Sequence, residues 1–160
     1  MANKKNKSDK KNQSIVIENR KARHDYFVED SVTCGIVLSG TEVKSIRSGK
    51  AQLKDSYAKI EKGELWLYNC HISPYQFGNR FNHEPLRKRK LLLTKKEIIK
   101  LSSKIKEKKL FLIPLKIYFS RNWAKLELAL AKGKKMYDKR ETIKKKELQR
   151  AIKEVKSKYI

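Results

Sequence analysis

The chain has 160 residues, and its 41 Lys and Arg against 17 Asp and Glu give a formal net charge of +24. This length predicts one domain with charged ends, and a field of that sign attracts polyanions, so nucleic acid, anionic lipid and acidic proteins are the candidate partners. No run of about 18 apolar residues occurs, and the first residues include no apolar segment, so we expect no membrane span, no export signal and a cytoplasmic protein.

Residues 1–13 contain five Lys and almost no apolar side chain. We expect a disordered basic arm that touches a polyanion loosely, and a plain solubilising tail explains the composition equally well. The globular part is expected over residues 14–131. It begins with a short strand at Ile15–Ile17, and Asn19 then caps a short basic helix that continues through Tyr26.

Three further segments have the composition of strands. Val32–Leu38 is rich in β-branched residues, which favour extended structure. Tyr57–Ile60 and Leu65–Ile72 flank the sequence Glu61-Lys62-Gly63-Glu64, which is typical of a hairpin turn. We expect these segments to be antiparallel neighbours.

The second half of the globular part is a helix followed by two long strands. Thr94-Lys95-Lys96-Glu97 is a capping box that predicts a helix from Lys95 to about Lys106, packed on the sheet. Leu110–Phe119 and Trp123–Ala131 are predicted strands, with Pro114 at a sheet edge or a bulge. The total of about five or six antiparallel strands and two or three short helices predicts an all-β dominated (α+β) fold, a small OB-like barrel.

Residues 132–160 form a basic tail. From Ala131 to Ile160 the chain has 10 Lys and 2 Arg against 1 Asp and 3 Glu, a net charge of +8. Asp138 can cap a helix with Glu141 three residues later. One face of that helix would hold Leu148, Ile152, Val155 and Tyr159. Because lysines repel one another on the other faces, we expect disorder in the free protein and a helix on an anionic partner.

The sequence gives little support for catalysis. Ser48-Gly49-Lys50 lacks the earlier glycine of a phosphate loop, and neither GxSxG nor GxGxxG occurs. The three histidines have no hydrolase-like order, and Cys70 and His71 would point to opposite faces of a strand. Cys34 and Cys70 are expected to be buried and reduced. We therefore expect no enzyme, no cofactor and no metal site.

Pairing of basic and aromatic residues favours binding to RNA, because cations contact phosphates and rings stack on unpaired bases. The pairs are Arg23-His24 before Tyr26-Phe27, Arg80-Phe81, Arg121 before Trp123, and Lys135 before Tyr137. For Tyr26, Phe27 and Trp123 we favour a place in the core, as is usual for aromatic residues. Tyr137 lies in a run too polar to bury it, so we favour a functional role.

A second basic group lies between Gly40 and Gly49. Lys44 and Arg47 are three residues apart and share one helical face, with Lys50 beyond the closing glycine. A solvated helix face would look the same. The glycines favour a backbone that can approach phosphate, which tilts the interpretation toward a binding edge.

Four blocks of sequence together resemble the small protein B family, the SsrA-binding proteins of bacteria. The blocks are Asn19-Arg20-Lys21-Ala22-Arg23-His24-Asp25-Tyr26-Phe27, Gly40-Thr41-Glu42-Val43-Lys44-Ser45-Ile46-Arg47 with Gly49-Lys50, Arg89-Lys90-Leu91-Leu92-Leu93, and Ala131-Lys132-Gly133-Lys134-Lys135 leading into Asp138-Lys139-Arg140. They follow the family's order over residues 19–140.

The resemblance implies an OB-like barrel that binds the tRNA-like domain of transfer-messenger RNA (tmRNA, or SsrA RNA). The protein would stand in for the missing anticodon arm and deliver this RNA to stalled 70S ribosomes, with its tail helical in the decoding centre and the empty mRNA channel. The resemblance places tmRNA contacts at Asn19, Lys21, Arg23, His24, Lys44, Arg47, Lys50, Leu92 and Lys125. It places contacts with small-subunit rRNA at Gly133, Lys134, Tyr137, Asp138, Lys139, Arg140, Lys144 and Lys145.

Two positions depart from the family pattern. Thr33 stands where some members have Glu, and Tyr137 replaces a His, so that it can stack on a base but cannot carry a positive charge. Alternative functions are a ribosomal or RNA-chaperone protein that binds rRNA, and a DNA-compacting or membrane-surface protein. The last class explains the charge but none of the blocks, and we expect neither DNA nor membrane as a partner.

Overall fold

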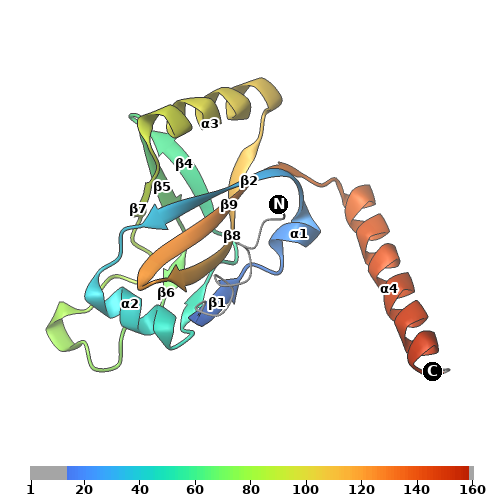
Figure 1. Ribbon diagram of the computed structural model, residues 1–160, viewed down its shortest axis with the longest axis horizontal. Coiled ribbons are helices and arrows are strands. Elements are labelled where there is room, and N and C mark those ends of the chain that lie inside the picture. The colour runs from blue at the N-terminus through green and yellow to red at the C-terminus, as the bar shows by residue number, and fades with distance from the viewer. Residues whose placement is uncertain (1–13, 159–160) are drawn as a thin grey trace, which may run out of the picture.

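A closed ring of antiparallel strands forms the centre of the computed structural model, which describes residues 14–158 (Figure 1). The expected arm at residues 1–13 and the predicted apolar position Tyr159 lie outside this range. The strands are β1 (Ser14–Glu18), β2 (Tyr26–Ile36), β3 (Ala51–Gln52), β4 (Tyr57–Glu61), β5 (Glu64–Tyr68), β6 (His71–Ile72), β7 (Arg89–Leu92), β8 (Phe111–Ser120) and β9 (Trp123–Gly133). The helices are α1 (Ala22–Asp25), α2 (Gly40–Arg47), α3 (Lys95–Lys108) and α4 (Met136–Lys158).

The main sheet has the strand order β1-β8-β4-β5-β7-β2-β9, and an additional pairing of β8 with β9 closes it into a barrel. β1 flanks the ring on β8, and β3 pairs with β6 in a separate ribbon. The predicted OB-like barrel is confirmed. The predicted number of strands was too low, because residues 14–158 form nine, and β3, β6 and β7 are too short to show a periodic pattern.

Two-residue turns close both long hairpins. The central residues of the β4–β5 turn, Lys62 and Gly63, have φ of 49° and 75°, and those of the β8–β9 turn, Arg121 and Asn122, have φ of 48° and 70°. Positive φ at both central positions matches the twist of the paired strands. The predicted pairing of these strands is confirmed.

The predicted strand Leu65–Ile72 is interrupted. β5 ends at Tyr68, and Asn69, with φ of 56°, turns the chain so that β6 leaves the barrel and joins the ribbon. The fully buried Cys70 marks this crossing. Asparagine tolerates the left-handed conformation better than most residues, which explains the break.

Apolar side chains fill the barrel, and two helices cover its ends. Leu65, Leu91 and Leu128 are among the core residues with almost no exposed surface. α3 lies across one end and buries Ile98 and Leu101, and its predicted capping box, Thr94 with Glu97, is confirmed (Figure 1). α2 closes the opposite end with the buried Ile46.

Asn19 does not cap a helix. Its side-chain nitrogen donates to the carbonyl oxygens of Pro114, at 2.9 Å, and of Leu53, at 3.2 Å, and the side chain is buried. The pairing of β8 with β9 shifts register just after Pro114, so the bulge interpretation of that proline is confirmed; β8 pairs with β1, β4 and β9 and is not an edge. α1 is only four residues long, and Tyr26 already begins β2.

The basic tail forms the helix α4, which projects from the barrel and buries none of its residues (Figure 1). The helix expected for the bound tail is therefore present. Disorder of the free tail stays a prediction. The predicted cap was misplaced: α4 begins at Met136, and Asp138, inside the first turn, accepts a hydrogen bond from the Lys135 N–H at 3.2 Å. No helix within residues 14–158 is long and apolar enough to cross a membrane.

Candidate nucleic-acid interface

The outer wall of the barrel brings Leu92 and Lys125 together. Gly35 of β2 is the register partner of both, Leu92 on β7 and Lys125 on β9. Leu92 is 51% exposed although its neighbour Leu91 is buried. A Cβ at Gly35 would lie 3.3 Å from Leu92 Cβ, so the glycine leaves room for this side chain. The row therefore joins an exposed apolar group to a cation across three strands.

Thr33 lies two residues before Gly35 and is the register partner of Glu127. The Glu127 carboxylate is 3.2 Å from Lys116 Nζ. The outer wall thus retains a carboxylate next to the position where this chain has threonine.

α2 carries the second predicted group of cations at the end of the barrel. Lys44, Arg47 and Lys50 are exposed. The Arg47 guanidinium carbon lies 4.5 Å from the centroid of the buried Phe119 ring, and Lys44 Nζ lies 5.2 Å from the Tyr75 ring centroid. Rings beneath these charges hold them in place without neutralising them.

A buried carboxylate, Glu42, fixes α2 to the β7 strand and was not predicted from the sequence. It accepts bonds from Arg87 Nη2 at 2.6 Å and from Arg89 Nε at 2.8 Å, and the side chains of Glu42 and Arg89 are fully buried. Burial raises the pKa of Glu42, but hydrogen bonds from Arg87 and the Ser39 N–H, together with the Arg89 charge, lower it overall. The only sequence signal was Ser39 three residues before Glu42, a capping box.

The third predicted group lies on α1, on a different side of the barrel from α2 (Figure 1). Lys21 and Arg23 are exposed and His24 is partly buried, with its Nδ1 2.9 Å from the Asp25 carboxylate. The hydrogen bond with His24 is the main cause that lowers the pKa of Asp25, and Lys139 and Lys21 contribute. The predicted tmRNA contacts therefore fall into separate groups rather than one continuous strip.

α1 is also where the tail is attached to the barrel. The Lys134 N–H donates to the Asp25 carbonyl at 2.8 Å, and Lys134 Nζ donates to the Arg23 carbonyl at 3.1 Å. Lys139 Nζ lies 3.4 Å from the Asp25 carboxylate. Predicted tmRNA and predicted ribosome residues thus share one network of contacts.

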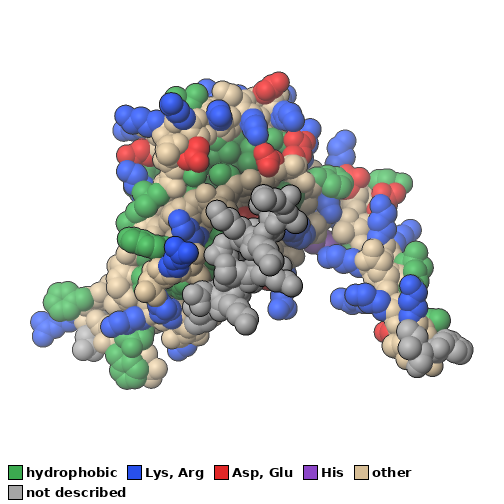
Figure 2. Space-filling model, viewed as in Figure 1, with side chains coloured by type: hydrophobic (Ala, Val, Ile, Leu, Met, Phe, Trp, Pro, Cys, Tyr) green, Lys and Arg blue, Asp and Glu red, His purple; other side chains and the backbone are tan. Residues whose placement is uncertain are grey.

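Beyond this network the predicted ribosome residues are open to solvent. Gly133 ends β9, and Tyr137 is 70% exposed. Arg140, Lys144 and Lys145 are exposed on α4. Glu141 raises the pKa of the Tyr137 hydroxyl, so the phenol stays protonated at neutral pH. Lys and Arg side chains cover much of α4 (Figure 2).

The basic–aromatic pairs have mixed outcomes. Tyr26 packs edge-on against Phe111 with centroids 6.4 Å apart, and Phe27 is half exposed with Lys134 Nζ 4.8 Å from its centroid. Trp123 is 73% exposed, so its predicted place in the core was wrong, because it begins β9 beside a tight turn. The predicted exposure of Tyr137 is confirmed.

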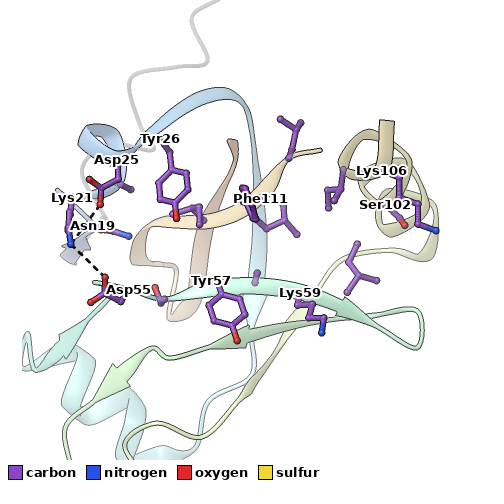
Figure 3. Close-up of a pocket in the computed structure, with 18 residues that line it drawn as sticks. Asn19, Lys21, Asp25, Tyr26, Asp55, Tyr57, Lys59, Ser102, Lys106 and Phe111 are labelled. Carbon is purple, nitrogen blue, oxygen red and sulfur yellow. Dashed lines mark ion pairs between the residues drawn. The ribbon is translucent and has the colours of Figure 1, made fainter. Parts of the chain in front are cut away.

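A cavity of about 690 Å³ lies between α1, α3, β4 and β8 (Figure 3). Tyr26, Tyr57 and Phe111 line it, together with Lys21, whose Nζ is 3.8 Å from the carboxylates of both Asp25 and Asp55. No nucleophile with an adjacent base lines this cavity. Within residues 14–158 no three His, Cys, Asp or Glu side chains gather as a metal site would require. The expectation of no catalysis and no cofactor stays a prediction.

Both cysteines are buried and free. Burial raises the pKa of Cys34 to about 12 and that of Cys70 to about 11. The predicted buried thiols are confirmed, and they are poor nucleophiles.

Together the closed barrel, the cations held on aromatic rings and the exposed basic helix define a small, strongly basic OB-like protein with the surface of a nucleic-acid binder. The family model "SmpB protein" matches residues 16–158. The chain belongs to the SmpB family.

Relatives and a solved structure agree with this assignment. The chain is 61% identical over 140 residues to an SsrA-binding protein of Carboxydothermus hydrogenoformans, covering 88% of this chain and 94% of that protein. It is 59% identical to an SsrA-binding protein of Geobacillus thermodenitrificans, covering 86% and 89%. A chain in the solved structure described as "tmRNA-SmpB: a journey to the center of the bacterial ribosome" aligns with a TM-score of 0.65 and 49% identity, covering 80% of this chain and 94% of that one.

Proposed function

We propose that this protein is a tmRNA-binding adaptor of trans-translation: it binds the tRNA-like domain of tmRNA, stands in for the missing anticodon arm and brings the RNA to stalled ribosomes. The observation that carries the proposal is membership of the SmpB family over residues 16–158, with relatives that are SsrA-binding proteins. The protein performs no chemistry of its own in this role and works in the cytoplasm, where ribosomes translate.

The barrel supplies the tmRNA side. Lys44, Arg47 and Lys50 on α2 contact phosphates, and the row of Leu92 and Lys125 contacts RNA along the outer wall. The support is that all five side chains are exposed or partly exposed and that none pairs with a carboxylate among the described residues.

α1 supplies the remaining tmRNA contacts through Lys21, Arg23 and His24. Asn19 acts as a positioning residue, because its buried amide holds the bulge at Pro114 next to the start of α1. An Asn19 substitution would therefore weaken RNA binding by moving α1 and not by removing a contact.

The tail supplies the ribosome side. Gly133 and Lys134 set its exit from the barrel, and Tyr137, Asp138, Lys139 and Arg140 face the decoding centre, with Tyr137 available to stack on an rRNA base. Lys144 and Lys145 follow in the empty mRNA channel. The support is that α4 is basic, exposed and free of core contacts.

Binding measurements test the RNA preference. Labelled tmRNA, an RNA duplex of equal charge and a DNA duplex are titrated with the protein at about 0.15 M salt, where unspecific electrostatic binding is screened. We expect tmRNA to bind most tightly. Equal affinity for the three would refute the proposal, and protein found in one copy on every small subunit in cells would favour a ribosomal protein instead.

Truncation tests the division between barrel and tail. A chain that ends at Arg140 should keep nearly all its tmRNA affinity, because α4 buries no residue, and should lose peptide tagging on stalled ribosomes. A matched chain with Lys144, Lys145 and Lys146 changed to Gln keeps its length and tests the charge alone. Loss of tmRNA binding on truncation would contradict the assignment of the two surfaces.

A further inference from the structure

The loop between β6 and β7, residues 73–88, exposes two phenylalanine rings. Phe77 is 72% exposed and Phe81 is 91% exposed. In Figure 1 the loop projects beyond the end of the barrel next to α2, and Figure 2 shows hydrophobic side chains beside basic ones at its tip. Apolar rings gathered in water commonly mark a binding site.

Hydrogen bonds hold the loop in shape. Asn82 Oδ1 accepts from the Tyr75 N–H at 3.0 Å, and Asn82 Nδ2 donates to the Tyr75 carbonyl at 2.7 Å. His83 bonds Thr41 of α2 at 2.8 Å through Nδ1 and the Ile72 carbonyl at 2.9 Å through Nε2. The rings are therefore presented on a fixed backbone.

Close packing against α2 reinforces this shape. A Cβ at Gly78 would lie 2.8 Å from Asn82 Nδ2 and 3.1 Å from Thr41 Cγ2, so only glycine fits there without a shift. Arg87, at the end of the loop, is held by the buried Glu42 carboxylate. A fixed loop loses little conformational freedom when it binds, which favours affinity.

Cations surround the rings and no carboxylate neutralises them. Tyr75 and Phe77 meet edge to face with centroids 5.7 Å apart, and Lys44 Nζ lies above Tyr75. Arg80 lies between the two exposed rings in the sequence and is itself exposed. Within residues 14–158 neither Lys44 nor Arg80 forms an ion pair. Rings flanked by unpaired cations match an unpaired base and its phosphates.

We propose that Phe77 and Phe81 form a stacking site for unpaired nucleobases of RNA, with Lys44 and Arg80 at the adjoining phosphates. The proposal rests on the proposed function in that it takes RNA as the partner, and it adds a site outside the four sequence blocks. A protein partner of the rings would want carboxylates to match the cations, whereas single-stranded RNA satisfies rings and cations at once.

The experiment compares single-stranded oligoadenylate with an RNA duplex of the same charge. The variant Phe77→Ala with Phe81→Ala should bind oligoadenylate at least about 10-fold more weakly, since each stacked base contributes about 5-fold to 150-fold in affinity. Affinity for the duplex should be unchanged. Phe77→Trp with Phe81→Trp retains the stacking faces and should restore binding.

Ile99→Ala is the matched control, because Ile99 is 65% exposed on α3 at the opposite end of the barrel. It should leave both affinities unchanged. Unchanged oligoadenylate affinity in the Phe77/Phe81 double variant would overturn the proposal, and so would an equal loss for oligoadenylate and duplex. These readouts do not involve tmRNA, so they remain decisive even if the protein shows no preference for tmRNA.

Discussion

Replacing Glu42 by Gln tests the buried ion cluster that holds α2 to the barrel. The substitution preserves the shape of the side chain but removes the charge that faces Arg87 and Arg89. Arg89 is fully buried and its guanidinium would lose its counter-ion, although its bonds to the Cys70 and Pro85 carbonyls remain. Removing one partner of a buried pair costs about 3–5 kcal/mol.

Urea unfolding of Glu42→Gln measures this cost. With a slope of about 2 kcal/mol per molar for a domain of this size, the midpoint should fall by about 1.5–2.5 M. Glu64→Gln is the control, because its ion pair with Lys90, at 2.9 Å, is about half exposed and should contribute at most about 1 kcal/mol. Equal shifts for the two variants would refute the view that burial sets the value of the Glu42 cluster.

The same cluster gives a pH dependence with a defined sign. The folded state lowers the pKa of Glu42 below its ordinary value of 4.5, so its contribution to stability is fully present above that value. It is lost as the pH falls through the lower pKa of the folded protein. The stability difference between wild type and Glu42→Gln should therefore shrink on acidification below about pH 4.5 and stay constant near neutrality.

Three further predictions concern the surface, the tail and the thiols. Lys44→Glu with Arg47→Glu should weaken tmRNA binding and flatten its salt dependence by roughly 0.9 per phosphate contact, whereas Lys96→Glu with Lys100→Glu on α3, with the same charge change, should do neither. Asp25→Asn removes the ion pair with Lys139 and should broaden the distance distribution between spin labels on α3 and α4, whereas Asp55→Asn, which pairs only with Lys21, should not. Cys34 and Cys70 should react with thiol reagents only after unfolding, because burial raises the pKa of the Cys34 thiol to about 12 and that of Cys70 to about 11. Fast modification of the native protein would contradict the last of these.

The barrel was predictable because its longest strands and its α3 helix carry strong local patterns. The alternation along Trp123–Ala131 and the capping box at Thr94 are set by neighbours in the sequence, and the structure confirms both. The misplaced features depend on distant partners. Asn19 looks like a cap in the sequence, yet it bonds Pro114, which is 95 residues away.

The candidate site was predictable only in part, for the same reason. Lys44 and Arg47 follow from helical spacing alone. The buried role of Glu42 requires Arg87 and Arg89, which are 45 and 47 residues away, and nothing in the local sequence signals that contact. The exposure of Trp123 also depends on the fold, because its composition alone favours the core.

The distribution of carboxylates decides which of the 41 Lys and Arg can bind RNA. On the wall and on α3, Lys90, Lys104 and Lys116 already face Glu64, Asp30 and Glu127. On α2 the one buried carboxylate points inward to two arginines, so the outward Lys44 and Arg47 keep their full charge. On α4 the only ion pair to the barrel within the described residues is that of Lys139 with Asp25, at the first turn. The net charge of +24 is therefore concentrated where it is least neutralised, at the α2 end and along the tail, and for this reason charge reversals of equal size on α2 and α3 should have unequal effects.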